Sequence, residues 1–228
     1  MQSASVKRSR PGGVKSPVAL RRRAERIAAM LADYIPAPRC GLNFRNAFEI
    51  TVATVLSAQC TDKKVNTVTP GLFAAYPDPA ALAGAARAEV ERHIRSLGLF
   101  RNKAENIIGL ARTLLELYRG EVPRTIPELV KLPGVGRKTA NCVLVNAFRL
   151  PGIMVDTHCL RLTARWGLTA ETAPDKVEAA LKALLPETEW AAFSERVIQF
   201  GRTVCTARAP ACASCPLRAG KLCHFVTN

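Results

Sequence analysis

The sequence contains no long apolar run, and its amino terminus has no apolar segment of the kind that secretory signals carry. A membrane-spanning helix needs roughly 20 consecutive, mostly apolar residues, and a signal peptide needs a shorter apolar stretch behind a basic one. We therefore expect an intracellular protein without a membrane partner. Its short core favours the bacterial cytoplasm over a eukaryotic organelle or nucleus.

Strand patterns are also missing, because no segment alternates apolar and polar residues between turn signals. Apolar residues recur instead at intervals of three and four, most clearly between Ala104 and Tyr118, with Gly120 expected just past the end of that helix. The fold class that we predict is all-α. The expected helices span 17–35, 44–59, 62–74, 87–95, 102–119, 126–131, 137–148, 157–165, 174–185 and 189–203.

Acidic residues are scarce: Asp and Glu number 18 against 33 Lys and Arg, which gives a formal net charge of +15. Such a surplus repels itself unless a polyanion is the usual partner. Nucleic acid is therefore favoured over an anionic membrane surface. Residues 1–17 contain basic residues and no acidic one, and we expect them to form a basic mobile tail.

The eight cysteines fall into two sets, and in an intracellular chain both are expected to be reduced. Four stand singly among apolar residues and are predicted to be small core residues: Cys40, Cys60, Cys142 and Cys159. The other four follow the pattern Cys-x6-Cys-x2-Cys-x7-Cys: Cys205, Cys212, Cys215 and Cys223. Clustered cysteines of this kind indicate a metal centre.

Two kinds of metal centre fit the clustered set. A structural zinc site usually has two close pairs of ligands, whereas a [4Fe-4S] cluster accepts uneven spacing because its irons are separate attachment points. We predict a [4Fe-4S] cluster, with zinc and unligated or disulfide-paired cysteines as alternatives. The segment after Val204 has too few large apolar side chains to fold by burial alone. A metal centre there would also hold Arg202 and Arg208 in position to contact phosphate.

The stretch "LPGVG" at 132–136 predicts a tight turn between two helices, since Gly134 and Gly136 tolerate positive φ and leave backbone amides uncovered. Amides beside a helix N-terminus bind anions, so a DNA phosphate could bind here without any side chain. A purely structural turn is the other interpretation of two glycines.

Lys138 falls in the first turn of the following helix, where the dipole disfavours its charge by only about 0.3–1 kcal/mol. An amine is nucleophilic only when uncharged, so most of the fall in pKa that a nucleophilic lysine needs would have to come from exclusion of water. The residues alone leave two roles open for Lys138, nucleophile or phosphate partner. Asp156 is expected at an N-cap, and could orient the amine and relay protons.

Several motifs occur together with the clustered cysteines in the order and spacing of one known family. They are "LSAQCTD" at 56–62, "GLFRNKAENI" at 98–107, "LPGVGRKTAN" at 132–141, "VDTH" at 155–158 and "GR" at 201–202. With these residues the chain resembles the endonuclease III family of the helix-hairpin-helix DNA glycosylase superfamily, over roughly residues 20–225.

The resemblance implies a monomeric base-excision repair enzyme acting on double-stranded DNA with damaged bases or abasic sites. It would remove oxidised pyrimidines and nick the strand 3′ to the abasic site by β-elimination, with Lys138 attacking C1′ and Asp156 assisting proton transfer. Gln59 would fill the gap left by the flipped base, and Leu99 would wedge the opposite strand. The residues expected to contact DNA are Gln59, Leu99, Gly134, Gly136, Arg137, Arg202 and Arg208.

The resemblance also implies two helical domains with a cleft between them. One is a six-helix barrel at 40–150 that includes the hairpin, and the other is an iron–sulfur domain built from 18–39 and 151–228. Two other functions stay open. Mismatch adenine glycosylases share the hairpin, the aspartate and the cluster but typically lack the lysine, and a non-catalytic helix-hairpin-helix module would only bind DNA.

Overall fold

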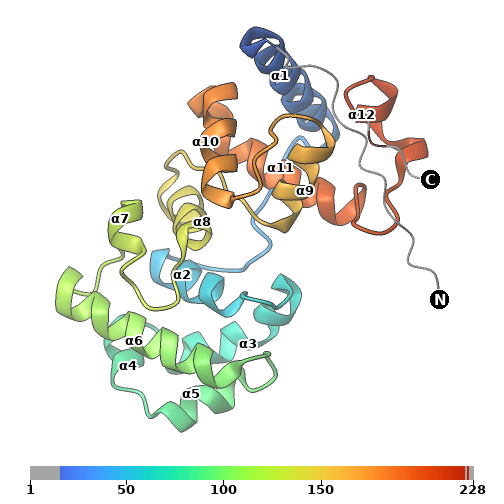
Figure 1. Cartoon of the computed structure of the whole chain (residues 1–228). Helices are drawn as coiled ribbons and strands as arrows, with labels where there is room; N and C mark the ends of the chain where they lie inside the picture. Colours follow the sequence, from blue (N-terminus) through green and yellow to red (C-terminus); the bar gives the residue numbers. More distant parts are fainter. Residues whose placement is uncertain (1–15, 224, 226–228) are drawn as a thin grey trace. The chain divides into compact units, whose positions relative to one another are not determined.

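The computed structural model describes residues 16–223 and 225, and these residues form helices and connecting turns with no strand among them (Figure 1). The predicted all-α class is confirmed. Of the predicted basic tail, only Ser16 and Pro17 are described, and they cap and begin the first helix; the rest lies outside the described residues. Within the described ranges, no helix has both the length and the apolar character needed to cross a bilayer.

Twelve α-helices and two short 3-10 helices make up the described chain. They are α1 (Pro17–Tyr34), α2 (Ala47–Leu56), α3 (Asp62–Ala75), α4 (Pro79–Ala83), α5 (Arg87–Ile94), α6 (Phe100–Tyr118), α7 (Ile126–Leu129), α8 (Arg137–Phe148), α9 (Thr157–Arg165), α10 (Pro174–Leu184), η1 (Glu187–Glu189), α11 (Trp190–Thr203), η2 (Cys212–Ser214) and α12 (Pro216–Ala219).

Two differences from the predicted helices have local causes. α2 begins three residues later than expected, because the side chain of Asn46 accepts a hydrogen bond from the backbone N–H of Glu49 at 2.9 Å and so fixes the first turn. α4 was not predicted, since five residues are too few to show a helical period. Its start is nevertheless capped by Asp78, which accepts from Ala81 N at 2.8 Å.

The chain divides into two compact units, one from Arg39 to Met154 and the other joining the residues up to Pro38 with those from Val155 onward. We call these the central unit and the terminal unit. Their assignment as a six-helix barrel domain and an iron–sulfur domain stays a prediction.

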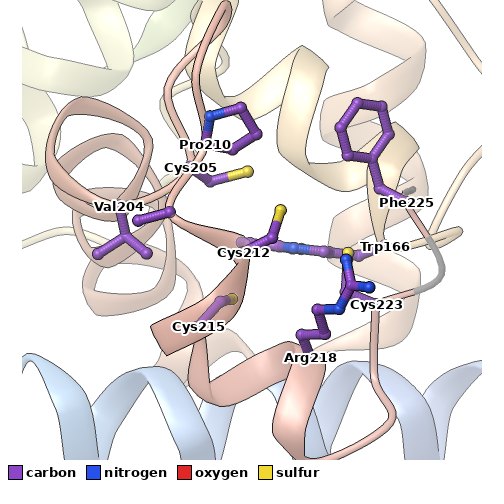
Figure 2. A pocket seen from close by; sticks show the side chains of 10 residues that line it. Trp166, Val204, Cys205, Pro210, Cys212, Cys215, Arg218, Cys223 and Phe225 are labelled. Atoms are coloured by element: carbon purple, nitrogen blue, oxygen red, sulfur yellow. The ribbon is translucent and has the colours of Figure 1, made fainter. Parts of the chain in front are cut away.

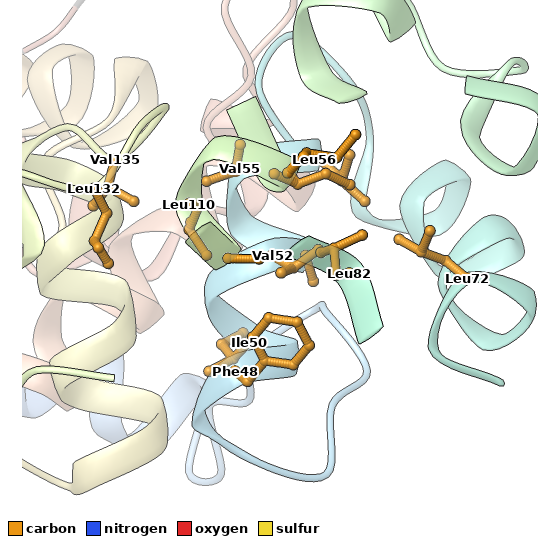
Figure 3. Close-up of a cluster of buried hydrophobic side chains, with 14 of the residues drawn as sticks. Phe48, Ile50, Val52, Val55, Leu56, Leu72, Leu82, Leu110, Leu132 and Val135 are labelled. Atoms are coloured by element: carbon orange, nitrogen blue, oxygen red, sulfur yellow. The ribbon is translucent and has the colours of Figure 1, made fainter. Parts of the chain in front are cut away.

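The central unit is built around α2, in which every residue except Ala47 is buried. Its apolar side chains, among them Phe48 and Val52, meet residues of the surrounding helices (Figure 3). α2 packs against α3, α6 and α8. Two hairpin side chains, Leu132 and Val135, join the same core and are 2% and 6% exposed. The hairpin is therefore anchored to the core by its apolar residues.

The terminal unit packs α1 against α10, α11 and α12, which brings both ends of the described chain into one core. Trp166 and Phe200 are fully buried in it, with ring centroids 6.1 Å apart in an edge-to-face arrangement. Gly201 lies where α9 and α11 pack together, and a β-carbon there would lie 2.8 Å from the side chain of His158. This contact explains the glycine of the "GR" motif in packing terms.

Candidate functional site

The hairpin at 132–136 connects α7 to α8, and its two glycines differ in what they do. Gly134 has a φ of +77°, and a β-carbon there would lie 2.9 Å from Val55 Cγ1 and 3.1 Å from Asn106 Cβ. Gly136 has an ordinary φ of −92°, and a β-carbon there would meet nothing within 4 Å. The fold therefore requires a glycine at position 134, whereas no neighbouring atom requires one at the exposed position 136.

This difference predicts opposite outcomes for two alanine substitutions. Gly134→Ala should destabilise the protein by about 1–3 kcal/mol, because it adds a strained backbone and a clash with α2 and α6. Gly136→Ala serves as the matched control and should change the free energy of unfolding by less than about 0.5 kcal/mol. Urea unfolding followed by circular dichroism measures both, and equal losses would contradict this account of the turn.

Lys138 is the second residue of α8 and is exposed, as is Arg137 beside it. Gly136 is the N-cap and makes no side-chain cap hydrogen bond to this end of the helix. The first-turn amides and the helix dipole therefore favour an anion here. The opposite face of α8 is buried and packs against α2, so the position of Lys138 is set by a helix fixed in the core.

Asp156 is the N-cap of α9, as predicted, and is half-buried. Its Oδ1 accepts a hydrogen bond from the backbone N–H of Cys159 at 2.8 Å. Asp156 belongs to the terminal unit and Lys138 to the central unit. The cap bond fixes the carboxylate at the start of α9.

Four non-glycine residues of the central unit have φ in the left-handed region: Arg119 and Arg149 at helix C-caps, and Gln59 and Leu99 in exposed turns, at 55° and 57°. Such a conformation costs about 1–2 kcal/mol for an ordinary side chain. Leu99 is also 57% exposed despite its apolar side chain. Residues held in strained backbone conformations cluster at functional positions.

The prediction that the isolated cysteines are core residues is only partly right. Cys142 and Cys159 are buried, and burial, with the nearby charge of Asp156, raises the pKa of Cys159 to about 12, so this thiol is inert near neutral pH. Cys40 and Cys60 are only partly buried.

Cys60 is the cysteine that differs most from the expectation. Its sulfur lies 3.0 Å from Nζ of Lys103, which is buried in α6 at 3% exposure. Burial by itself would raise the pKa of the Cys60 thiol, but the hydrogen bonds from Lys103 and the backbone of Gly98 outweigh it, so this pKa is lowered. Sequence reasoning missed the contact. The available signal was a lysine on the apolar face of α6, four residues before Ile107.

The four clustered cysteines line one cavity of the terminal unit, and their sulfurs face a common space (Figure 2). Trp166, Val204 and Phe225 supply apolar walls around it. Among the described residues, no three His, Cys, Asp or Glu side chains are arranged as a site for one metal ion. The structure therefore brings the four predicted cysteines together around this one cavity.

The loop that carries the first of these cysteines is held by arginines of α9. Arg165 Nη1 lies 3.1 Å from Cys205 Sγ and donates to Thr206 O at 3.0 Å. Arg161 Nη2 donates to the carbonyl oxygen of Cys205 at 2.9 Å. These bonds hold the backbone around the cavity, while Arg208 in the same loop is exposed.

The thiols fit a group that carries positive charge. Burial raises the pKa of Cys223, and the nearby thiolates of the other three clustered cysteines raise it further, because like charges repel. Four thiolates in this partly apolar cavity would repel one another, and a cationic metal centre would relieve that repulsion. The donor set is all sulfur, which suits either an iron–sulfur cluster or zinc.

Comparison with known proteins identifies the family. Residues 52–187 match the family model described as HhH-GPD superfamily base excision DNA repair protein. The chain is 49% identical over 198 residues to endonuclease III of Synechocystis sp., which covers 86% of this chain and 90% of the relative.

Two solved structures are similar over nearly the whole chain. A non-covalent endonuclease III–DNA complex has a TM-score of 0.85 and 45% identity, covering 90% of this chain and 95% of its own. A trapped endonuclease III–DNA covalent intermediate has a TM-score of 0.84 and 44% identity, covering 92% and 97%. A family model matched over more than half of the sequence and relatives this similar over most of both chains show that this chain belongs to the HhH-GPD superfamily of base excision DNA repair proteins, and within it to the endonuclease III family.

Proposed function

We propose that this chain is a DNA glycosylase and abasic-site lyase that removes oxidised pyrimidines from duplex DNA. The observation that carries the proposal is an exposed lysine, Lys138, in the first turn of a helix that follows a glycine hairpin. The similar structure of a covalently trapped endonuclease III–DNA intermediate supports it, because a covalent step needs a nucleophile on the protein.

In the proposed reaction Lys138 attacks C1′ of the damaged nucleotide. The bond from Nζ to C1′ forms as the glycosidic bond breaks, and the base leaves with a proton. The attached amine then loses a proton, and O4′ takes one up as the C1′–O4′ bond breaks, so the sugar ring opens and a Schiff base forms between Nζ and C1′. Removal of a C2′ proton then expels the 3′ phosphate by β-elimination. Asp156 is the group that we assign to proton transfer, since its carboxylate is held at the N-cap of α9.

Lys138 must lose its proton before it can react, and the chain alone does not exclude water from it. An ordinary lysine in water keeps its proton up to about pH 10.4. The helix dipole contributes only about 0.3–1 kcal/mol against the charge. Bound DNA must therefore exclude the remaining water from Lys138. Deprotonation of the amine then depends on correct docking of the lesion.

DNA binding is assigned to two groups of contacts. The uncovered amides at Gly136 and the side chain of Arg137 suit a phosphate at the hairpin. Exposed Arg202 and Arg208, near the cysteine cavity, suit phosphates elsewhere on the duplex. Gln59 and Leu99, both exposed on strained turns, are proposed to enter the base stack around the flipped nucleotide.

We propose that Cys205, Cys212, Cys215 and Cys223 hold a [4Fe-4S] cluster. When bound, the cluster would supply positive charge and four fixed attachment points, which is a structural contribution rather than a redox step. The residues of this chain then keep the loop carrying Arg208 in one conformation through Arg161 and Arg165.

Reduction with borohydride tests the proposal. The protein is incubated with a duplex that contains one oxidised pyrimidine, and a Schiff base is reduced to a stable amine that links protein to DNA. We expect a covalent complex and a strand nick with the damaged duplex, and neither with the undamaged one. A nick without any covalent product would contradict the lysine mechanism.

A further inference from the structure

Cys60 and Lys103 join two turns that lie far apart in sequence. One turn follows α2 and carries Gln59, and the other precedes α6 and carries Leu99. Cys60 comes directly after Gln59, while Lys103 is in the second turn of α6, and its backbone N–H donates to the carbonyl oxygen of Leu99 at 3.0 Å. The 3.0 Å contact between Cys60 Sγ and Lys103 Nζ therefore bridges the two strained turns.

The groups around the sulfur of Cys60 support this contact. Besides the side chain of Lys103, the backbone N–H of Gly98 lowers the pKa of the Cys60 thiol. Gly98 immediately precedes Leu99, so one of these groups belongs to the turn itself. Lys64 on α3 adds a positive charge nearby. These groups all favour the thiolate form of Cys60.

Burial makes this contact more than incidental. Lys103 is 3% exposed, and a buried ammonium is stable only when a partner compensates for the lost water. Cys60 also packs against the central core, so neither group can move away at low cost. A strained turn keeps its conformation only when its surroundings hold it.

We propose that the Cys60–Lys103 contact is a latch that holds the turns of Gln59 and Leu99 in their DNA-inserting conformations as one unit. Cys60 and Lys103 are then positioning residues, since they act through the two inserted side chains and touch no reacting atom. The assignment of Gln59 and Leu99 to insertion rests on the function proposed above.

A double-mutant cycle tests the latch. Cys60→Ala and Lys103→Met should each weaken binding to a duplex with a tetrahydrofuran abasic analogue by about 10-fold, and the double variant should also lose only about 10-fold, because one contact is lost in all three. Binding to undamaged duplex should change less than about 2-fold, since insertion is not needed there. Cys60→Ser keeps an acceptor and should recover most of the affinity.

Cys40→Ala is the matched control, because Cys40 is likewise partly buried against the same core. It should leave both affinities within about 2-fold of wild type. Additive losses in the double variant, or equal losses on damaged and undamaged DNA, would overturn the latch.

The pH profile of thiol alkylation reports the contact in the free protein. Iodoacetamide reacts with the thiolate, and the reaction of Cys60 can be followed by peptide mass spectrometry between about pH 6 and 10. Because Lys103 stabilises the thiolate, Lys103→Met should move the profile of Cys60 to higher pH and leave that of Cys40 in place. An unmoved Cys60 profile would refute the contact.

Hydrogen exchange separates failure of the latch from failure of the proposed function. In the free protein, either substitution should speed amide exchange in both turns, 57–61 and 95–99, although each variant alters only one side of the contact. Loosening of the altered turn alone would overturn the latch. If exchange couples the turns while wild-type protein gives no borohydride-trapped complex, the latch stands and the proposed function fails.

Discussion

Lys138→Gln should abolish strand cleavage at an abasic site, lowering the rate by at least about 10³-fold, while binding to the same duplex weakens by less than about 5-fold. Glutamine keeps most of the length of the side chain but has no amine to form a Schiff base. Cleavage assays under single-turnover conditions measure the loss of chemistry, and fluorescence anisotropy measures binding. Borohydride trapping should disappear together with cleavage.

Lys131→Gln is the matched control for this loss. Lys131 is also exposed and immediately precedes the hairpin, so its substitution removes the same charge from the same region. We expect its cleavage rate to stay within about 3-fold of wild type. Similar moderate losses in both variants would indicate that Lys138 only neutralises phosphate, as in a non-catalytic DNA-binding module. On a duplex with a mismatched adenine, release of adenine without any nick by wild-type protein would instead favour the mismatch adenine glycosylase alternative.

Cys212→Ser should have the second large effect, through the fold of the carboxy-terminal segment. Wild-type protein should be brown and contain about four irons per chain. The variant should lose most of its iron, its thermal midpoint should fall by about 10 °C, and its affinity for DNA should fall by about 10-fold or more. The reason is that few large apolar residues, among them Leu217 and Leu222, are buried after Val204.

Cys40→Ser controls for the loss of a thiol, because Cys40 is a partly buried cysteine outside the cavity. It should keep the colour, the iron content and a midpoint within a few degrees of wild type. Colourless wild-type protein with one zinc per chain would overturn the cluster assignment in favour of zinc. Iron-containing protein whose stability is unchanged by Cys212→Ser would show that the cluster does not hold the segment.

Long helices were predictable from sequence because their apolar spacing is repeated over several turns. α6 is the clearest example, and it ends as expected near Gly120, with Arg119 and Gly120 at φ 54° and 83°. α4 was missed because a five-residue helix depends on its cap and proline and not on a period. The shift in the start of α2 likewise reflects one hydrogen bond, which the side chain of Asn46 accepts from Glu49 N–H.

The placement of the candidate residues was predictable where they lie close together in sequence. The hairpin, Lys138 and the four cysteines all follow short spacings that local chemistry explains. The steric difference between Gly134 and Gly136 could not be predicted, since it depends on Val55 and Asn106 from other helices. The contact of Cys60 with Lys103 was missed for the same reason: 43 residues separate the two, and neither looks unusual alone.

The identity of the residue in the trapped complex tests the central claim most directly. After borohydride reduction on an abasic duplex, nuclease and trypsin digestion should leave the sugar remnant on one peptide. The account predicts residues 138–149, "KTANCVLVNAFR", uncut after Lys138 because the modified side chain blocks trypsin there. An adduct on any other lysine or on the terminal amine, or no adduct at all, would contradict it.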